Sequence, residues 1–508
     1  MTFSMEYPVW VLAHKAKGRE IKRIGDRYYL YEVSSTYDKT KKATRKRSGS
    51  YLGRITEAGL VAKGTSNELI IPRCVSIKEY GASAYLASCL SEEYQVLREL
   101  LPQYASELLV CAIFRLLYRS AFKQMEWHYM SSYLSETHPN LKLNGKTISG
   151  WLSIVGEQRE VLAAIMRKLS GGESVILIDN THITTYSKQN LSAQLGYDSE
   201  RKFDTQVNLL YLFAQEAQMP VFYRCVQGSV REVRAAQLTL KESGFTAAIL
   251  VADKGFHSAN NVVILDEDGW QYILPLRRNN ALCNYDALRI EGKTAFDGHF
   301  LHEQRIIWYK TLETATDTLP VPLKRRILFF DERLKVAESA DYLQRCAQSK
   351  TGYTIEQFHS RECRFGCITV LTNTTVLIST TAPKSKTGQA IAQPITPERV
   401  FELLKSRNDI EQLYDNYKNV LEADKTYMRS DASLEAWHFI NFLALRAYYR
   451  LLKALQVNHL ATKFSPQDAL LLLQTHKKIR INKQWIDAEI PKKAQNITKT
   501  INTEHKSA

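Results

Sequence analysis

Residues 174–276 alternate between short apolar runs and amphipathic segments, and this order constrains the fold more than any other feature of the sequence. Short apolar runs bounded by turn residues are typical of buried strands, whereas longer segments with apolar residues every three or four positions are typical of helices. Gly244 and Gly269 follow the two amphipathic segments, as expected of helix ends. The predicted order is strand, strand, strand, helix, strand, helix, strand, over residues 174–179, 205–215, 220–228, 229–244, 246–253, 258–269 and 270–276.

Two aspartates end strands of this predicted sheet. Asp179 ends the first strand, in ILIDNTHI, and Asp253 ends the fourth, in LVADKGFHS. The strand order matches the ribonuclease H-like fold, in which the first and fourth strands are neighbours. Because ligands of open α/β sheets bind at the carboxyl ends of the strands, we expect the two carboxylates to meet there. The alternative is that each aspartate is an ordinary turn or helix-cap residue.

A third acidic residue, Glu411, lies on a helix that is predicted to begin after Thr396, a good N-cap. Arg407 and Glu411 are four residues apart and share a face of this helix. Lys418 lies two turns beyond Glu411 on the same face. Such a trio is often a surface ion-pair ladder of little energetic value. Its place after the fifth strand instead favours a third carboxylate of the same site.

Three carboxylates at one site suit hard divalent cations, which prefer oxygen ligands. Two such ions, about 3.5–4 Å apart, offset the charge of a phosphodiester: one activates a water or hydroxyl, and the other stabilises the leaving oxygen. We therefore expect Asp179, Asp253 and Glu411 to be catalytic and to bind two Mg²⁺ ions, with Mn²⁺ as the alternative metal. His257 invites a general-base role, but a metal-activated water does not require one.

The three motifs together resemble those of the DDE transposases of bacterial insertion sequences, in the group with a β-rich insertion before the catalytic glutamate. The second motif matches the pattern D-x-G-[FY]-x-S, starting at Asp253. The third matches the R-x3-E-x6-K part of the signature Y-x2-R-x3-E-x6-K, from Arg407 to Lys418. Leu404 stands at the tyrosine position of that signature. The resemblance covers roughly residues 170–455.

This resemblance implies a metal-dependent DNA transposase that cuts element ends and joins them to target DNA. It also implies double-stranded DNA as the partner, both the terminal inverted repeats and the target, and a homodimer in the synaptic complex. The residues of the central region expected to contact DNA are Arg407, Lys418, Asn180, Thr181 and Lys254. Two other functions stay open. One is a non-catalytic DNA-binding protein derived from a transposase, and the other is a metal-dependent nuclease or resolvase without strand transfer.

The charge of the chain favours a polyanionic partner, because the formal net charge is +15. The most basic stretch, residues 14–54, is predicted to form short strands with a charged hairpin loop at 38–47. Tyrosines alternate there with basic residues, and such a module is suited to tracking a phosphate backbone. The alternative is a solvated hairpin whose charges prevent edge-to-edge aggregation. The DNA contacts expected from this stretch are Lys41, Lys42, Arg45, Lys46 and Arg47.

The predicted architecture is an α/β protein with a ribonuclease H-like catalytic core and a β-rich insertion, preceded by a small basic β-module and a helical domain. Strands of the insertion are predicted at residues 305–312, 325–334 and 367–374. The C-terminal tail is rich in basic residues and is expected to be partly disordered. The predicted segments are the basic module (1–75), the helical domain (76–170), the first part of the core (171–276), the insertion (277–394), the helical second part of the core with Glu411 (395–456) and the tail (457–508).

Nothing in the sequence points to a membrane. The N-terminus has no signal-peptide pattern, and no run of 18 apolar residues occurs. The eight cysteines are scattered, as in proteins of a reducing compartment. We therefore expect a bacterial cytoplasmic protein that associates with the nucleoid when bound to DNA. Cys363 and Cys367 are expected to be structural rather than zinc ligands, and Trp308 to be a core residue rather than a platform for an extruded base.

Overall fold

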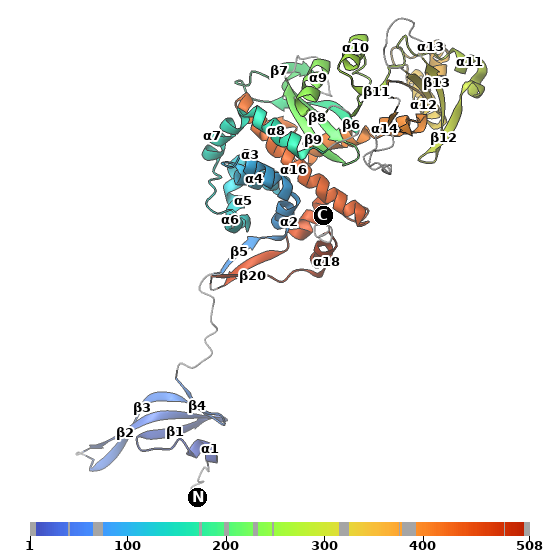
Figure 1. Ribbon diagram of the computed structural model, residues 1–508. Helices are drawn as coiled ribbons and strands as arrows, with labels where there is room; N and C mark the ends of the chain where they lie inside the picture. The colour runs from blue at the N-terminus through green and yellow to red at the C-terminus, as the bar shows by residue number, and fades with distance from the viewer. Residues whose placement is uncertain are drawn as a thin grey trace, which may run out of the picture. The chain divides into compact units, whose positions relative to one another are not determined.

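The computed structural model describes residues 7–38, 41–63, 75–171, 175–197, 203–226, 232–245, 248–313, 325–374, 376–377, 393–481 and 483–501 (Figure 1). The chain divides into two compact units, and each has its own fold. Unit 1 comprises Met1–Ser76 and Arg480–Trp485, and unit 2 comprises Ile77–Ile479 and Ile486–Ala508.

Unit 1 is built on a four-stranded antiparallel sheet in the order β1-β2-β3-β4. Its small core consists of Val11, Leu30 and Ile55, with Trp10 and Tyr28 packed against it. Its elements are α1 (Val9–Leu12), β1 (Arg19–Ile24), β2 (Arg27–Asp38), β3 (Ala43–Thr56) and β4 (Gly59–Ala62).

The β2–β3 hairpin is longer than the sequence predicts. A charged loop is expected over residues 38–47, but Ala43 already pairs with Asp38 across the two strands. The predicted loop was too long. Thr36 and Tyr37 favour extended backbone, so the hydrogen-bonded pairing of β2 with β3 continues into the charged segment. The expected DNA-contacting residues therefore divide between Arg45, Lys46 and Arg47 on β3 and Lys41 and Lys42 in the turn.

The helices that the sequence predicts between residues 80 and 170 are present in unit 2. Asn144 begins one of them, α7, because its side chain accepts a hydrogen bond from the backbone N–H of Thr147 at 3.0 Å. Gly156 lets α7 approach helix α16 closely, since a Cβ there would lie 1.6 Å from the backbone oxygen of Ala432. The helices are α2 (Gly81–Cys89), α3 (Ser91–Leu100), α4 (Ala105–Tyr118), η1 (Phe122–Gln124), α5 (Met125–Ser131), α6 (Leu134–Thr137), α7 (Gly145–Gly156) and α8 (Arg159–Leu169).

The predicted strand order is confirmed in the first half of a large mixed sheet. Strands β6, β8 and β9 form an antiparallel meander; β10 then pairs parallel with β6, and β11 pairs parallel with β10. Ser258 caps helix α10 as predicted, since its Oγ accepts a hydrogen bond from the N–H of Asn261 at 3.2 Å. The elements are β6 (Val175–Thr185), β8 (Phe203–Ala214), β9 (Met219–Val226), α9 (Glu232–Ser243), β10 (Ile249–Val251), α10 (Ala259–Glu267) and β11 (Gln271–Pro275).

The first strand extends further than predicted. β6 continues past Asp179 to Thr185 because its partner β8 is equally long and pairs with it from Ile176 to Thr184. An additional strand, β7 (Gln194–Tyr197), pairs with the start of β8. Asp179 therefore lies within β6 and does not end it, although the part of β6 that pairs with β10 ends at Leu177.

The strands of the predicted insertion extend this same sheet, in the order β12-β13-β14-β15-β11. The three predicted strands are present, except that residues 332–334 belong to a helix. Asp331 starts that helix, because its carboxylate accepts a hydrogen bond from the N–H of Leu334 at 3.1 Å. The elements are α11 (Asp286–Glu291), η2 (Gly292–Ala295), β12 (Gly298–His302), β13 (Arg305–Glu313), β14 (Arg325–Asp331), α12 (Glu332–Ala347), α13 (Ile355–Arg361), η3 (Glu362–Arg364), β15 (Cys367–Thr372), β16 (Val376–Leu377) and β17 (Gln393–Pro394).

The long helix predicted after Thr396 is interrupted. It begins as predicted, with the Thr396 side chain accepting a hydrogen bond from the N–H of Arg399 at 3.2 Å. The first helix then ends before Arg407, and the second continues into a π-helical turn, which holds more residues than an α-helical turn. The elements are α14 (Pro397–Lys405), α15 (Asn408–Asp415), η4 (Asn416–Val420) and β18 (Lys425–Thr426), which pairs parallel with β6.

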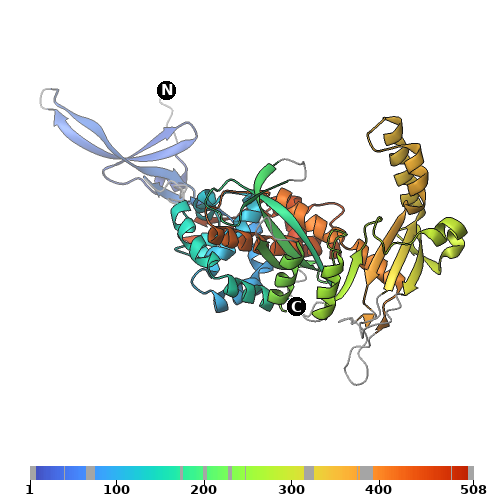
Figure 2. The ribbon, with the colours of Figure 1, turned by 90° about the horizontal axis from the view of Figure 1, so that it is seen from above.

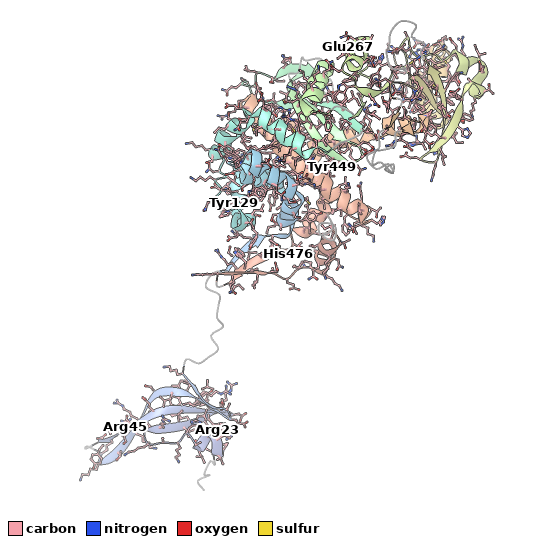
Figure 3. All side chains as sticks on the ribbon, viewed as in Figure 1. Arg23, Arg45, Tyr129, Glu267, Tyr449 and His476 are labelled. Carbon is pink, nitrogen blue, oxygen red and sulfur yellow. The ribbon has the colours of Figure 1, made fainter. Side chains whose placement is uncertain are left out.

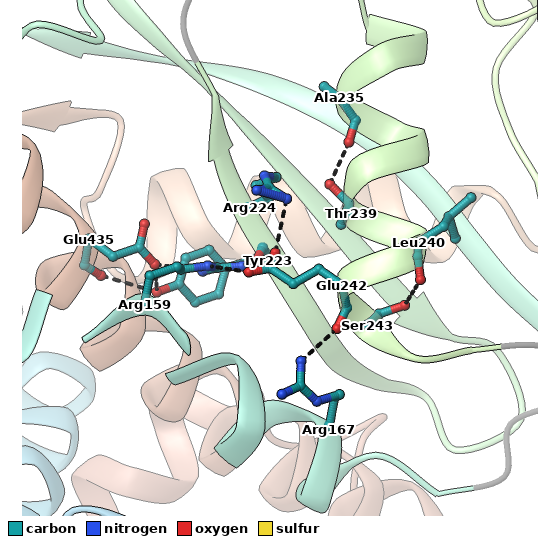
Figure 4. A network of polar contacts seen from close by, with 10 residues as sticks. All are labelled: Arg159, Arg167, Tyr223, Arg224, Ala235, Thr239, Leu240, Glu242, Ser243 and Glu435. Atoms are coloured by element: carbon teal, nitrogen blue, oxygen red, sulfur yellow. Dashed lines mark hydrogen bonds and ion pairs between the residues drawn. The ribbon is translucent and has the colours of Figure 1, made fainter. Parts of the chain in front are cut away.

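Helix α16 (Asp431–Val457) packs against α4, α7 and β9 and so joins the helices to the sheet (Figures 1 and 2). A polar network strengthens this junction (Figure 4). Arg159 of α8 donates to both carboxylate oxygens of Glu242 on α9, at 3.0 and 2.9 Å, and to Glu435 of α16 at 2.6 Å.

Neither α16 nor any other helix in the described part of the chain is long and apolar enough to cross a membrane.

The sequence predicts a partly disordered C-terminal tail, but the described residues of the tail form helices and strands. The basic composition hid an apolar helix face, on which Ala494, Ile497 and Ile501 are buried. The elements are α17 (Pro466–Leu473), β19 (Lys477–Ile481), β20 (Gln484–Asp487) and α18 (Lys492–Ile501).

Candidate active site

Asp179 lies on β6, and Asp253 lies just beyond the end of the neighbouring strand β10. The parallel register of β6 and β10 pairs Leu177 with Val251. Two residues further along each chain segment, Asp179 and Asp253 occupy corresponding positions. Both line a small cavity of about 60 Å³, whose other lining residues are Ile178, Asn180, Leu210 and Phe256. The structure therefore brings these two predicted site residues together.

Arg407 connects Glu411 to Asp253. One guanidinium nitrogen of Arg407 donates to the Asp253 carboxylate at 2.7 Å, and the other donates to the Glu411 carboxylate. Arg407 can reach both because it lies at the break between α14 and α15, as the N-cap residue of α15. Its side chain is 21% exposed, whereas that of Glu411 is 55% exposed. All three predicted carboxylates, which we call the acidic site, thus lie around one arginine.

Helix α15 is fixed to the sheet by Tyr414, one turn after Glu411. The buried Tyr414 hydroxyl donates to the backbone oxygen of Asp179 and accepts a hydrogen bond from the N–H of Tyr211 at 3.2 Å. Asp179 and Tyr211 are partners in the β6–β8 ladder. One hydroxyl therefore joins α15 to the two strands at the position of Asp179, and this contact sets the distance between Glu411 and the aspartates.

The surroundings of the Asp179 carboxyl act on its pKa in opposing directions. Its pKa is raised to about 6, chiefly by burial and to a lesser degree by the charges of Asp253 and Glu411. The N–H of Asn180, which donates to the carboxylate at 2.9 Å, and the charge of Arg407 act in the opposite direction. The guanidinium of Arg407 is thus bonded to two carboxylates and acts on the third through its charge, which is an arrangement that favours additional positive charge.

A larger cavity of about 640 Å³ adjoins Asp253. We call it the basic hollow, because cations predominate among its charged lining residues. Arg278 is paired there with Glu338 at 2.7 Å. Its charged lining residues are Asp253, Lys254, Arg277, Arg278, Glu338, Lys405 and Arg407.

The acidic site suits divalent metal ions by its chemistry, since carboxylate oxygens are the ligands that Mg²⁺ and Mn²⁺ prefer. In the described part of the chain, however, no three His, Cys, Asp or Glu side chains are arranged closely enough to hold an ion. Arg407 accounts for this difference, because its guanidinium is bonded to two of the three carboxylates. The positive charge beside these carboxylates therefore comes from the protein itself.

The residues predicted to contact DNA near the acidic site have different surroundings. Lys254 is exposed and lines the basic hollow. Asn180 lines the small cavity beside Asp179. Thr181 is only 8% exposed, so it has little surface for a DNA contact. Lys418 lies in the π-helical turn, where burial lowers its pKa and the charge of Asp424 partly offsets this effect.

His257, Trp308 and Cys367 each form a hydrogen bond with another residue of the protein. His257 accepts or donates one hydrogen bond with Asn280 at 3.2 Å, and burial lowers its pKa. The indole N–H of Trp308 donates to Glu332 at 3.1 Å, and its ring packs on a small cluster of the second half of the sheet. The Sγ of Cys367 donates to the backbone oxygen of Cys363 at 3.5 Å.

Sequence reasoning missed Tyr414, Arg277 and Lys405. Tyr414 follows Glu411 by three residues and looked like one more apolar position of an amphipathic helix. Its hydroxyl reaches the backbone of Asp179 because α15 passes β6 at that position, which no local pattern reveals. Arg277 directly follows the predicted strand 270–276, and its position at a strand end was the available signal.

These features define a mixed α/β protein with an acidic site at the centre of its large sheet. Residues 170–446, just over half of the chain, match the family described as "Transposase DDE domain". The chain therefore belongs to this family of DDE transposases, which use divalent metal ions. Among curated proteins, none matches the chain.

Among solved structures, the chain is similar to a cryo-EM structure of the piggyBac transposase synaptic complex with hairpin DNA. The two sequences are 9% identical, and the TM-score is 0.37. The match covers 78% of this chain and 70% of that chain.

Proposed function

We propose that this protein is the DNA transposase of a bacterial insertion sequence, which cuts element ends and joins them to target DNA at Asp179, Asp253 and Glu411. Family membership supports a transposase. The observation that carries the proposal further is the geometry of the acidic site. Asp179 on β6 and Asp253, two residues beyond the parallel strand β10, occupy corresponding positions, and Arg407 bonds the glutamate of helix α15 and Asp253 together.

The strand order supports a ribonuclease H-like core. Strands β9, β8, β6, β10 and β11 lie side by side in that order, with β10 and β11 parallel to β6. This is the arrangement expected from three meandering strands followed by two helix–strand units. The segment between β11 and α14 is then an insertion, whose strands β12 to β15 extend the core sheet through β11.

The acidic site suits two Mg²⁺ ions, with Mn²⁺ as the alternative, held by the three carboxylates. When bound, the ions would activate the attacking water or 3′-hydroxyl and stabilise the leaving oxygen. The chain's own residues prepare the site. Tyr414 holds the backbone of Asp179, and Arg407 holds Asp253 and Glu411 in reach of each other. Metal binding then requires Arg407 to release at least one carboxylate, and the freed guanidinium is positioned for a DNA phosphate.

The basic hollow is the proposed path of the DNA strand to this site. Lys254 and Arg407 flank Asp253 on its wall, and Arg277 and Lys405 line it further away. Phosphates attracted there would lie beside the carboxylates that hold the metal ions. Lys418 belongs to this proposal only as a more distant cation, because it is half-buried near Asp424.

The outer part of the β2–β3 hairpin in unit 1 is a second proposed DNA contact. Residues 33–38 and 43–48 pair as a two-stranded ribbon, and the described side chains of its β3 strand are exposed. A two-stranded ribbon fits the major groove of B-DNA. Arg45 and Arg47 point to one face of the ribbon and Lys46 to the other, because side chains alternate along a strand. Arg45 is labelled in Figure 3.

The proposal is tested by incubating the purified chain and Mg²⁺ with labelled DNA that carries the inverted repeats flanking its gene. We expect cleavage at the repeat ends, followed by joining to a target duplex, and loss of both steps in Asp253→Asn. The matched control is Asp286→Asn, an exposed carboxylate that is distant in the sequence from the acidic site. Cleavage without end specificity would instead support a nuclease, and binding without cleavage in Mg²⁺ or Mn²⁺ would support a non-catalytic DNA-binding protein.

A further inference from the structure

Two tyrosines form an exposed stacked pair at the far end of β6 from the acidic site. Tyr186 directly follows β6, and Tyr427 directly follows β18, which pairs parallel with β6. Their ring centroids are 5.2 Å apart, and the ring planes differ by 20°. The two residues are 54% and 72% exposed, respectively. We call Tyr186 and Tyr427 the tyrosine pair.

The backbone around the tyrosine pair is held rigidly. The N–H of Tyr186 donates to the oxygen of Thr426 at 3.2 Å, and the hydroxyl of Ser187 donates to the backbone oxygen of Arg429 at 3.0 Å. The two chain segments are therefore fixed to each other on both sides of the rings. Large aromatic side chains that are rigidly presented and still exposed are typical of a surface that a ligand covers.

Two cavities flank the tyrosine pair, and all the charged side chains that line them are basic. A cavity of about 310 Å³ lies beside Tyr186, Lys188, Tyr427 and Arg429. A second, of about 630 Å³, is lined by Tyr427 and Arg429 together with Lys123 and Lys146. Neither lining includes an acidic residue. Within the part of the chain that the structure describes, none of these four cations has an acidic partner within salt-bridge distance.

We propose that the tyrosine pair and the four surrounding cations bind a DNA strand, with an unpaired base stacked on an exposed tyrosine face and its phosphates on the cations. Free cations attract the phosphate backbone, and a tyrosine ring stacks on any base because every base has a π-face. The phosphates of duplex DNA would pair with the four cations, but its stacked bases would leave the two tyrosine rings exposed. The combination of rings and cations therefore favours a strand with an unpaired base.

The position of this surface fits a strand that also reaches the acidic site. Tyr186 lies seven residues beyond Asp179 on the line of β6, which corresponds to roughly 23 Å at about 3.3 Å per residue. This distance is about seven base-pair steps along a duplex. The inference rests on the proposed function, since it assigns the surface to DNA that the acidic site processes. It adds a place where DNA is unpaired near the cleavage point.

The test compares a duplex that carries a short single-stranded overhang with the same duplex in which the overhang is abasic. Anisotropy gives the affinity of the full chain for each, and 2-aminopurine in the overhang reports stacking. We expect the wild-type chain to prefer the overhang with bases by roughly 5- to 150-fold. Tyr427→Ala should remove this preference and the change in 2-aminopurine fluorescence, and Tyr427→Phe should retain both. Equal preference in Tyr427→Ala and the wild type would overturn the proposal.

The cations are tested separately by salt dependence. Replacing Lys188 and Arg429 with glutamine should reduce the slope of log affinity against log salt by about 1.4 for the overhang substrate, if each contacts one phosphate. Lys453→Gln, on the exposed side of α16, is the matched control and should not change the slope. An unchanged slope in the double variant would overturn the phosphate contacts. If the wild type cuts paired ends but ignores the overhang, this inference fails and the proposed function stands; if it binds no DNA, both fail.

Discussion

The Tyr414 hydroxyl is predicted to stabilise the junction between α15 and the sheet, and Tyr414→Phe tests this directly. The hydroxyl is the hydrogen-bond partner of three backbone groups: the oxygens of Asp179 and Leu209 and the N–H of Tyr211. These groups belong to buried or half-buried residues, so removing the hydroxyl takes a partner from each of them without letting water replace it. Each such loss costs about 1–3 kcal/mol when the group stays unsatisfied, and about 1 kcal/mol when it finds another partner. We expect a loss of roughly 1–3 kcal/mol in the free energy of unfolding.

Tyr211→Phe is the matched control for this experiment. The Tyr211 ring lies beside that of Tyr414, with centroids 6.1 Å apart, and it is also fully buried. Its hydroxyl has no hydrogen-bond partner among the described residues. Removing it should leave stability unchanged or raise it slightly, because a buried unsatisfied polar group is unfavourable. Urea denaturation at constant pH measures both variants. Equal stability of Tyr414→Phe and wild type, or equal losses in the two variants, would refute the reasoning.

Three further predictions concern stability and metal dependence. Arg446→Met should destabilise the fold by about 1–3 kcal/mol in urea denaturation, because the buried Glu93 carboxylate would lose one of its two arginine partners and keep only Arg450; unchanged stability would contradict this. Burial and the charge of Arg159 lower the pKa of His438 to about 3, so the folded state binds its proton less readily than the unfolded state. Stability should therefore fall by about 1.4 kcal/mol per pH unit as pH drops below 6.5, and His438→Gln should remove that part of the slope; an identical pH profile in the variant would exclude it. Removing divalent metal with EDTA should abolish DNA cleavage and leave binding of the paired duplex within about threefold, as filter binding would show; retained cleavage would argue against metal catalysis.

The sequence predicted the first half of the sheet well because each element there has a strong local signal. Buried strands such as 249–251 are purely apolar, and the helices between them have recognisable ends at Ser258, Gly244 and Gly269. The strand order then follows from connection rules, so the neighbourhood of Asp179 and Asp253 could be inferred from the chain alone. The length of β6 could not, because it depends on a partner strand thirty residues away in the sequence.

The predictions that failed depended on tertiary contacts. The helical pattern after Thr396 is continuous in the sequence, but the helix is interrupted at Arg407, whose side chain bonds Asp253. The basic tail is predicted to be partly disordered because its apolar residues are few, yet the side chains of Ile497 and Ile501 are buried. The tyrosine pair has no sequence signature at all, since Tyr186 and Tyr427 meet only through the pairing of β6 with β18.

The central claim is that Asp253 is a ligand of a catalytic metal, and a change of ligand chemistry tests it most directly. In Asp253→Cys the hard carboxylate is replaced by a softer thiolate, which binds Mg²⁺ poorly and accepts Mn²⁺ more readily. The measurement is the rate of end-specific DNA cleavage by this variant in each metal, compared with the wild type. The account predicts cleavage at least about 100-fold slower in Mg²⁺ and partly restored by Mn²⁺. Cleavage in Mg²⁺ within about threefold of the wild-type rate would contradict a metal-binding role for Asp253.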